Sequence, residues 1–335
     1  MPNVLLTYSC VRSCPYCFAG DESRKRSGDK FLSWENLIYL ADFFETAGEM
    51  KIQLLGGEPT LHPDFIDMVI YLLERKFDIT VFTSGIMKNR ILSEMASVFA
   101  NVPLSRLTFN CNLNDPEQTP ASLSEQESVR AFLSQFGYRT TPGFNIYRTD
   151  FKLDFIFRLI SEFGMFRMIR LGITHPVPGK KNSFIAPDDV GAIYGTICAY
   201  EPLLDRLRIR LRFDCGFPLC ELSPTQLGTL YRLVNGTFHF SCVPIIDIGP
   251  DMDVWSCFPL SSYQRKSIFD FDSMNAVRNH FHKLHEIIRV EVAGIYEKCD
   301  SCVWRGERLC SGGCLGHSLN RFGLEFPLRM QEVYS

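Results

Sequence analysis

The chain has 335 residues, 46% of them hydrophobic, which is enough to build one large domain and a smaller second one. A net charge of −3 argues against a polyanionic partner, because binding to nucleic acid generally requires a basic face. No apolar segment approaches membrane-spanning length and no signal peptide begins the chain, so we expect a cytoplasmic protein without membrane association. In that reducing compartment we expect the thirteen cysteines to serve metal or redox chemistry rather than disulfides.

The first two thirds of the chain alternate between strand-like and helix-like patterns. Short apolar runs predict strands at residues 4–8, 52–55, 79–82, 107–110, 144–147 and 168–173. Helical periodicity predicts helices at residues 34–46, 62–75, 88–99, 122–136, 151–163 and 187–207, the first of them capped by Ser33. Alternation of this kind implies parallel strands joined by right-handed crossovers, and the six units predict an α/β fold, a partial (β/α)6 TIM-like barrel over residues 1–207.

Three cysteines, Cys10, Cys14 and Cys17, follow the first predicted strand at once. Three thiolates on one short loop can bind three irons of a four-iron cluster and leave the fourth iron open to a ligand that is not protein. The alternative is structural zinc, which normally needs a fourth cysteine or histidine nearby, and residues 1–30 contain none. We therefore interpret the triplet as the ligands of a cluster with an exchangeable site.

A second motif, Gly56-Gly57-Glu58-Pro59, ends the second predicted strand. The two glycines let backbone approach a ligand closely, and Glu58 can accept a hydrogen bond from an ammonium group. Tyr16, just before the last cysteine of the triplet, offers an aromatic face to a purine. Because chemistry in such sheets gathers at the carboxyl ends of the strands, both motifs are expected on one rim.

The cysteine spacing, the aromatic residue before Cys17 and the Gly-Gly-Glu-Pro turn together resemble the radical S-adenosylmethionine (radical SAM) enzymes. The resemblance implies that S-adenosylmethionine chelates the open iron of a 4Fe-4S cluster, with its amino group received by the turn from Gly56 to Pro59. It also implies that an electron from an external one-electron reductant releases a 5′-deoxyadenosyl radical, which abstracts hydrogen from unactivated carbon.

The resemblance further implies contacts to the ribose and carboxylate of S-adenosylmethionine from polar residues at the ends of later strands. By location alone these are Ser84, Asn110, Arg148 and His175. The alternative for each of them is a polar strand end that meets water.

Beyond residue 207 the composition changes, and eight cysteines follow against five in all the preceding residues. They are Cys215, Cys220, Cys242, Cys257, Cys299, Cys302, Cys310 and Cys314. A hairpin is predicted from strands at 238–248 and 254–255, and a helix at 273–296. This set resembles the SPASM or twitch extension of radical SAM enzymes, which implies that residues 208–335 form a small cysteine-rich α+β domain with one or two auxiliary 4Fe-4S clusters.

The match to that extension has three departures. Seven residues rather than five separate Cys302 from Cys310, Met252 stands where glycine is expected, and no cysteine follows Cys314. Two cysteine-ligated clusters nevertheless need eight thiolates, the number present. The alternatives are a single auxiliary cluster, or zinc at residues 299–314.

The two auxiliary clusters are expected to divide these cysteines. We assign one cluster to Cys242, Cys257 and Cys314 together with Cys220 or Cys215, and the other to Cys299, Cys302 and Cys310, completed by the remaining cysteine or left open. Cys111 and Cys198 are expected to be buried small hydrophobic residues.

The substrate class follows from the extension, since relatives that carry it mostly modify peptides or protein side chains. The resemblance thus implies a peptide or protein substrate that is crosslinked or oxidised, with the auxiliary clusters accepting an electron or binding substrate. Only nine residues precede Cys10, so a leader peptide would bind elsewhere on the chain or through a separate leader-binding protein. The alternatives are a small-molecule cofactor precursor, such as a nucleotide or tetrapyrrole, and a noncatalytic zinc-stabilised scaffold.

Overall fold

The structure, a computed structural model, describes residues 1–18, 31–119, 122–215, 218–234, 240–291 and 294–322. Within these residues one sheet holds ten strands in the order β10-β9-β8-β1-β2-β3-β4-β5-β6-β7. The strands from β1 to β7 pair in parallel, each with its neighbour in sequence. Their bounds are β1 Asn3–Thr7, β2 Lys51–Gly56, β3 Asp78–Thr83, β4 Leu107–Asn112, β5 Thr140–Ile146, β6 Met168–Ile173 and β7 Arg210–Phe213.

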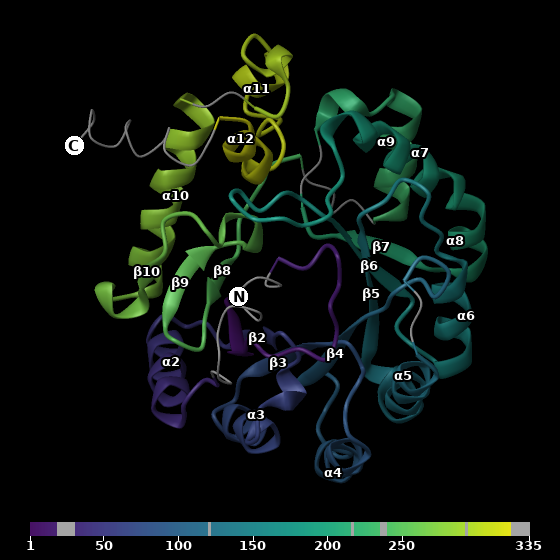
Figure 1. Cartoon of the computed structure of the whole chain (residues 1–335), viewed down its shortest axis with the longest axis vertical. Helices are drawn as coiled ribbons and strands as arrows, with labels where there is room; N and C mark the ends of the chain where they lie inside the picture. The colour runs from purple at the N-terminus through teal and green to yellow at the C-terminus, as the bar shows by residue number, and fades with distance from the viewer. Residues whose placement is uncertain (19–30, 120–121, 216–217, 235–239, 292–293, 323–335) are drawn as a thin grey trace.

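Helices connect the parallel strands and lie along the outer face of the curved sheet (Figure 1). They are α2 Trp34–Thr46, α3 Phe65–Glu74, α4 Asn89–Phe99, α5 Leu123–Phe136, α6 Asp154–Phe163, α7 Val190–Ala199 and α8 Glu201–Leu207. The sheet begins at β10 and ends at β7 without closing on itself. The predicted α/β fold with a partial barrel is therefore confirmed.

Helix α2 shows how local sequence specifies an element. Ser33 is extended, and its side chain accepts a hydrogen bond from the backbone N–H of Asn36 at 3.2 Å, as the predicted N-cap requires. One face of the helix is fully buried against the sheet through Leu37, Leu40, Ala41 and Phe44. The apolar periodicity and the cap agree, so the predicted and observed bounds coincide.

The barrel has one parallel strand more than predicted. Strand β7 has only four residues, in which arginines alternate with Leu211 and Phe213, so its apolar signal is too short to stand out. It pairs with β6 although it lies beyond the predicted boundary at residue 207. The helix predicted at 187–207 is divided, because Pro202 lacks a backbone N–H and cannot continue α7, but fits the first turn of α8.

The carboxyl-terminal part continues the same sheet. Strand β8 (Ile246–Ile248) pairs in parallel with β1, and β9 (Asp253–Ser256) and β10 (Lys266–Ser267) follow as antiparallel neighbours. The predicted strand at 238–248 is thus shorter, and its residues 238–239 lie outside the described residues. The predicted helix at 273–296 is α10 (Met274–Glu291), with residues 292–293 outside the described part of the chain.

Three further helices complete the described chain. They are α9 (Pro224–Leu233), α11 (Val303–Gly306) and α12 (Leu315–Phe322), of which the last two lie near the upper end of α10 (Figure 1). None of the helices in the described segments combines the length and hydrophobicity needed to cross a bilayer.

The two faces of β1 separate the outer core from the interior of the barrel. Val4 and Leu6 join the large core that the outer helices cover, whereas Leu5 packs in a small separate cluster with Tyr8, Leu55 and Trp255. Since successive side chains on a strand point to opposite faces, the second cluster marks the concave side. The concave side therefore receives alternate residues from each parallel strand.

The junction between β1 and β8 contains a buried carboxyl group. Asp247 is fully buried and accepts a hydrogen bond from the Asn3 side chain at 2.6 Å. Burial raises the pKa of Asp247 to about 7, although the Asn3 hydrogen bond opposes this. Its ordinary value is about 4, so between pH 4 and 7 the folded chain binds more protons than the unfolded chain, and stability falls as the pH rises.

Replacing this aspartate should therefore change the pH dependence of stability. From pH 5 to pH 8 we expect the free energy of unfolding of Asp247→Asn to rise by about 2–3 kcal/mol relative to that of the parent, because only the parent must ionise a buried carboxyl group. Thermal unfolding of anaerobically purified protein across this range measures the difference. Asp67→Asn, at an exposed position on α3, is the control. If the difference in stability between the parent and Asp247→Asn stays constant with pH, the raised pKa of Asp247 is refuted.

Candidate active site

The loop that carries Cys10, Cys14 and Cys17 follows β1 and crosses the open end of the barrel (Figure 1). A backbone hydrogen bond of 3.1 Å from the N–H of Cys17 to the carbonyl of Cys14 turns the loop back on itself. Cys10 is solvent-accessible, yet protein atoms surround it closely. Burial, followed by the charges of Glu58, Cys17 and Cys14, raises the pKa of Cys10 to about 11. A bound cation would relieve this crowding of thiolates, so the donor set fits an iron–sulfur cluster.

The Gly-Gly-Glu-Pro turn holds the backbone of the cysteine loop. The N–H of Gly57 donates to the carbonyl of Thr7, and the N–H of Glu58 to that of Ser9, both at 2.8 Å. A Cβ on Gly56 would lie 2.3 Å from the Thr7 oxygen, and one on Gly57 would lie 2.0 Å from the Ser9 oxygen. The structure thus shows that the glycines admit the loop backbone itself, a role that the sequence did not indicate.

This close packing makes a prediction for Gly57→Ala. The added methyl group must displace the cysteine loop, so we expect the variant to bind about four fewer irons per chain and to lose activity. Iron determination after anaerobic reconstitution measures the effect. Gly195→Ala is the matched control, because a Cβ at this position on α7 meets no atom within 4 Å. If Gly57→Ala retains the full iron content, the close contact between Gly57 and the cysteine loop is not needed for cluster binding.

Glu58 ties the end of β2 to the end of β3. Its carboxylate is fully buried and accepts hydrogen bonds from the hydroxyls of Thr60 at 2.9 Å and Thr83 at 2.8 Å, and from the backbone N–H of Ser84 at 2.7 Å. The Ser84 hydroxyl also donates to it at 2.5 Å. Both carboxylate oxygens are therefore engaged by the protein, and contacts of Glu58 and Ser84 with S-adenosylmethionine stay predictions. Pro59 begins the 3-10 turn Pro59–Leu61 next to them.

Tyr16 is fixed beside the cysteine loop by residues that the sequence did not single out. Its hydroxyl donates to the side-chain oxygen of Asn114 at 2.8 Å, and its ring lies 5.0 Å from that of Tyr147. The amide nitrogen of Asn114 is 4.0 Å from the sulfur of Cys14. Asn114 lies just after β4, so only its position near a strand end could have indicated it.

The other predicted contacts do not share one place. Asn110 is buried, and its side-chain oxygen has no hydrogen-bond partner among the described residues. Arg148 is exposed and pairs with Asp150 at 2.7 Å. His175 is buried against His317, with 5.4 Å between the ring centroids, and so lies with the carboxyl-terminal segment.

An ion pair lies on the concave side of β6 and β7. Arg170 pairs with Asp214, donates to the Asn112 side chain at 3.3 Å, and stacks over the ring of Phe82 at 5.0 Å. Burial raises the pKa of Asp214, while Arg170 and Arg212 oppose the shift. Polar and charged groups therefore line the side of the barrel toward the cysteine loop, where they can orient a substrate.

The carboxyl-terminal cysteines gather in two groups. The first cysteine group is Cys215, Cys242, Cys257 and Cys314. Burial, and then the charges of Cys242, Cys314 and Cys215, raise the pKa of Cys257 well above its ordinary value. Burial and the charges of Cys314 and Cys242 do the same to Cys215. Cys215 and Cys314 also line one cavity, so we treat these four thiols as one group.

The second cysteine group is Cys220, Cys299, Cys302 and Cys310. Burial, with Cys299 and Cys310 among its neighbours, raises the pKa of Cys220 to about 11. Burial and the charges of Cys310 and Cys302 raise the pKa of Cys299. In the described residues no three His, Cys, Asp or Glu side chains are arranged around a single metal ion. In an iron–sulfur cluster, by contrast, each thiolate binds a different iron.

Comparison with known proteins bears on this site. A family profile described as the Radical SAM superfamily matches residues 4–131. Molybdenum cofactor biosynthesis protein 1 of Homo sapiens is 35% identical over 95 residues, which are 28% of this chain and 15% of that protein. A probable GTP 3′,8-cyclase of Sulfolobus acidocaldarius is 23% identical over 235 residues, covering 66% of this chain and 71% of that protein. The chain spans only 15–16% of the length of the first curated relatives.

The fold comparison extends over nearly the whole chain. The crystal structure of Streptococcus suis SuiB bound to S-adenosylmethionine has a TM-score of 0.61 and 15% sequence identity, and the match covers 93% of this chain and 72% of that one. At this identity the likeness is one of fold. Members of the radical SAM superfamily use a 4Fe-4S cluster and S-adenosylmethionine, and the cysteine loop seated on the glycine turn falls within the matched residues. Residues 4–131, which include the cysteine triplet and the glycine turn, therefore match the Radical SAM superfamily.

Proposed function

We propose that this protein is a radical SAM enzyme that abstracts hydrogen from a peptide or protein substrate, with two auxiliary 4Fe-4S clusters in its carboxyl-terminal part. The observation that carries the proposal is the seating of the Cys10, Cys14 and Cys17 loop on the Gly56-Gly57 turn at the open end of the barrel. When bound, the cluster and S-adenosylmethionine supply a 5′-deoxyadenosyl radical. The barrel positions the substrate carbon next to it.

The chain's own residues have distinct tasks in this proposal. The three thiolates of the loop hold the cluster, and backbone of the glycine turn receives the amino group of S-adenosylmethionine. Tyr16, held by Asn114, lies beside Cys14 and presents its ring to the adenine. Arg170 and Asp214 orient polar groups of the substrate on the concave side. The outer core and the surrounding helices keep bulk water from the opposite face of the sheet.

The auxiliary clusters follow from the two cysteine groups. Each group supplies four thiolates, the complement of one fully cysteine-ligated cluster. We assign Cys215 to the first group and Cys220 to the second, a choice that the sequence left open. Clusters held by these two cysteine groups would supply the acceptor for the electron that the substrate gives up.

Two observations support different substrate classes. A peptide is favoured by the fold likeness over 93% of the chain to SuiB, a structure of which is described as bound to precursor peptide SuiA. A nucleotide is favoured by the sequence relatives named GTP 3′,8-cyclase. We favour the peptide, because the fold likeness covers 93% of the chain, whereas the match to the probable GTP 3′,8-cyclase covers 66% of it.

One experiment tests the function and then the substrate. Protein reconstituted without oxygen is reduced in the presence of S-adenosylmethionine, and 5′-deoxyadenosine is measured by mass spectrometry. We expect its formation, accelerated by a peptide encoded near the gene and not by GTP. A product derived from GTP would replace the peptide assignment, and colourless protein that binds only zinc would contradict the enzyme.

A further inference from the structure

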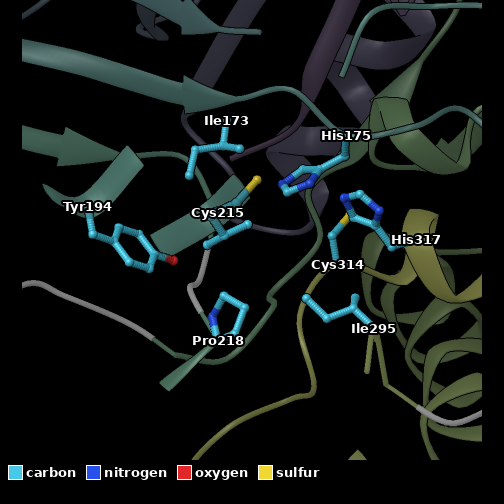
Figure 2. Close-up of a pocket in the computed structure, with 9 residues that line it drawn as sticks. Ile173, His175, Tyr194, Cys215, Pro218, Ile295, Cys314 and His317 are labelled. Atoms are coloured by element: carbon cyan, nitrogen blue, oxygen red, sulfur yellow. The ribbon is translucent and has the colours of Figure 1, made fainter. Parts of the chain in front are cut away.

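A small cavity lies between the end of β6 and the start of α12 (Figure 2). His175 enters it from the barrel and His317 from α12, and Cys215 and Cys314 of the first cysteine group line it as well. About 330 Å³ of space in and around it is not filled by atoms, part of which opens to solvent. The cavity therefore brings a barrel strand end into contact with the first cysteine group.

The imidazole ring of His175 lacks hydrogen-bond partners among the described residues around this cavity. His175 is only 8% exposed, and neither of its ring nitrogens has a hydrogen-bond partner among the described residues. The ring is held in place: His317 packs against it at 85° between ring planes, and the Asn182 side chain donates to the backbone carbonyl of His175 at 2.9 Å. A buried polar group in a fixed position without a partner is costly, so a partner is expected in the cavity.

The lining of the cavity limits what that partner can be. Ile173, Val190, Pro218 and Ile295 provide apolar walls, so they offer the imidazole no acceptor. Tyr194 reaches the cavity from α7, and Cys215 and Cys314 bring sulfur. In Figure 2 the ring of His175 lies between the side chains of Cys215 and His317. Besides the Tyr194 hydroxyl and the His317 ring, sulfur of the first cysteine group is therefore the acceptor that the lining side chains offer to His175.

We propose that His175 donates a hydrogen bond to a sulfur atom of the auxiliary cluster held by Cys215, Cys242, Cys257 and Cys314, and thereby raises the reduction potential of that cluster. The inference rests on the proposed function for the existence of the cluster. A reduced cluster carries more negative charge than an oxidised one, so a donor at its sulfur stabilises the reduced form. In this role His175 contacts the cluster itself, and it links the barrel rim to that cluster.

The test is an EPR-monitored redox titration of the full chain in which Cys10, Cys14 and Cys17 are replaced by alanine, so that the auxiliary clusters alone contribute. His175→Phe keeps the ring volume and removes the donor. We expect one of the auxiliary midpoint potentials to fall by about 59 mV, a tenfold change in the reduction equilibrium of a one-electron couple, with the iron content unchanged. His175→Gln retains an N–H donor and is expected to restore most of the potential.

His280→Leu is the control, because it removes a half-buried imidazole that packs against Phe271 and Phe281 away from the cavity lining. If His175→Phe does not accumulate as folded protein, His175→Leu takes its place. An unmoved potential in these variants would overturn the inference. A loss of about four irons would overturn it too, since it would make His175 a ligand. Absence of iron from the triplet-free parent would instead refute the auxiliary clusters of the proposed function, before any histidine is changed.

Discussion

Replacing Cys14 with alanine is expected to abolish 5′-deoxyadenosine formation, a loss on the order of 10³-fold or more. The variant leaves two thiolates, Cys10 and Cys17, where three irons need a protein ligand. Binding of S-adenosylmethionine should be lost together with the iron, because the open iron is its anchor. Iron content and product formation are measured on the same anaerobic preparation.

The matched control for this variant is Cys111→Ala. Cys111 is completely buried on β4, and it lies in the outer core rather than on the cysteine loop. Its replacement removes one sulfur from packed surroundings, which should cost about 1 kcal/mol of stability and leave iron and product formation near the parent's. Product formation by Cys14→Ala at the parent's rate would disprove the role of the triplet, whatever the carboxyl-terminal cysteines bind.

The second large effect is expected for Cys220→Ala. In the structure this residue joins Cys299, Cys302 and Cys310, although at least 79 positions of sequence separate it from them. Its loss should remove one auxiliary cluster, so iron should fall from about 12 to about 8 per chain, while the cluster beside His175 keeps its EPR signal. Cys215→Ala should instead remove the EPR signal of the cluster beside His175 and leave that of the other auxiliary cluster.

Cys198→Ala provides the comparison for Cys220→Ala. Cys198 lies half-buried on α7 and belongs to neither cysteine group, so its replacement should leave all iron in place. Should Cys220→Ala retain about 12 irons, Cys220 would not be a ligand. Should Cys215→Ala and Cys220→Ala each abolish the same signal, one shared auxiliary cluster would replace the two.

Features that depend on neighbouring residues could be predicted from the sequence. The cap at Ser33 and the apolar face of α2 act within a few residues, so both the element and its bounds follow from local pattern. The cysteine triplet and the glycine turn are also local, and their position after β1 and β2 places them on one rim in any parallel sheet. Even so, the reason for the glycines, contact with the backbone of Thr7 and Ser9, came only from the structure.

The tertiary structure decided the features that depend on distance across the chain. Strand β7 is too short to give a periodic signal, and its pairing with β6 is what makes it a strand. Strand ends that look equivalent in sequence separate in space, because the chain turns differently after each one. Arg148 thus faces solvent with Asp150, and His175 meets α12.

The division of the carboxyl-terminal cysteines shows the same limit most directly. The sequence determined their number, which equals the eight thiolates that the two proposed clusters would need, because composition needs no folding to be known. It could not decide between Cys215 and Cys220, which are five residues apart, because each could reach either group. The fold places Cys215 near Cys257 and Cys314, and Cys220 near Cys299 and Cys310, since packing against β6, α7 and the final helices sets which thiols meet.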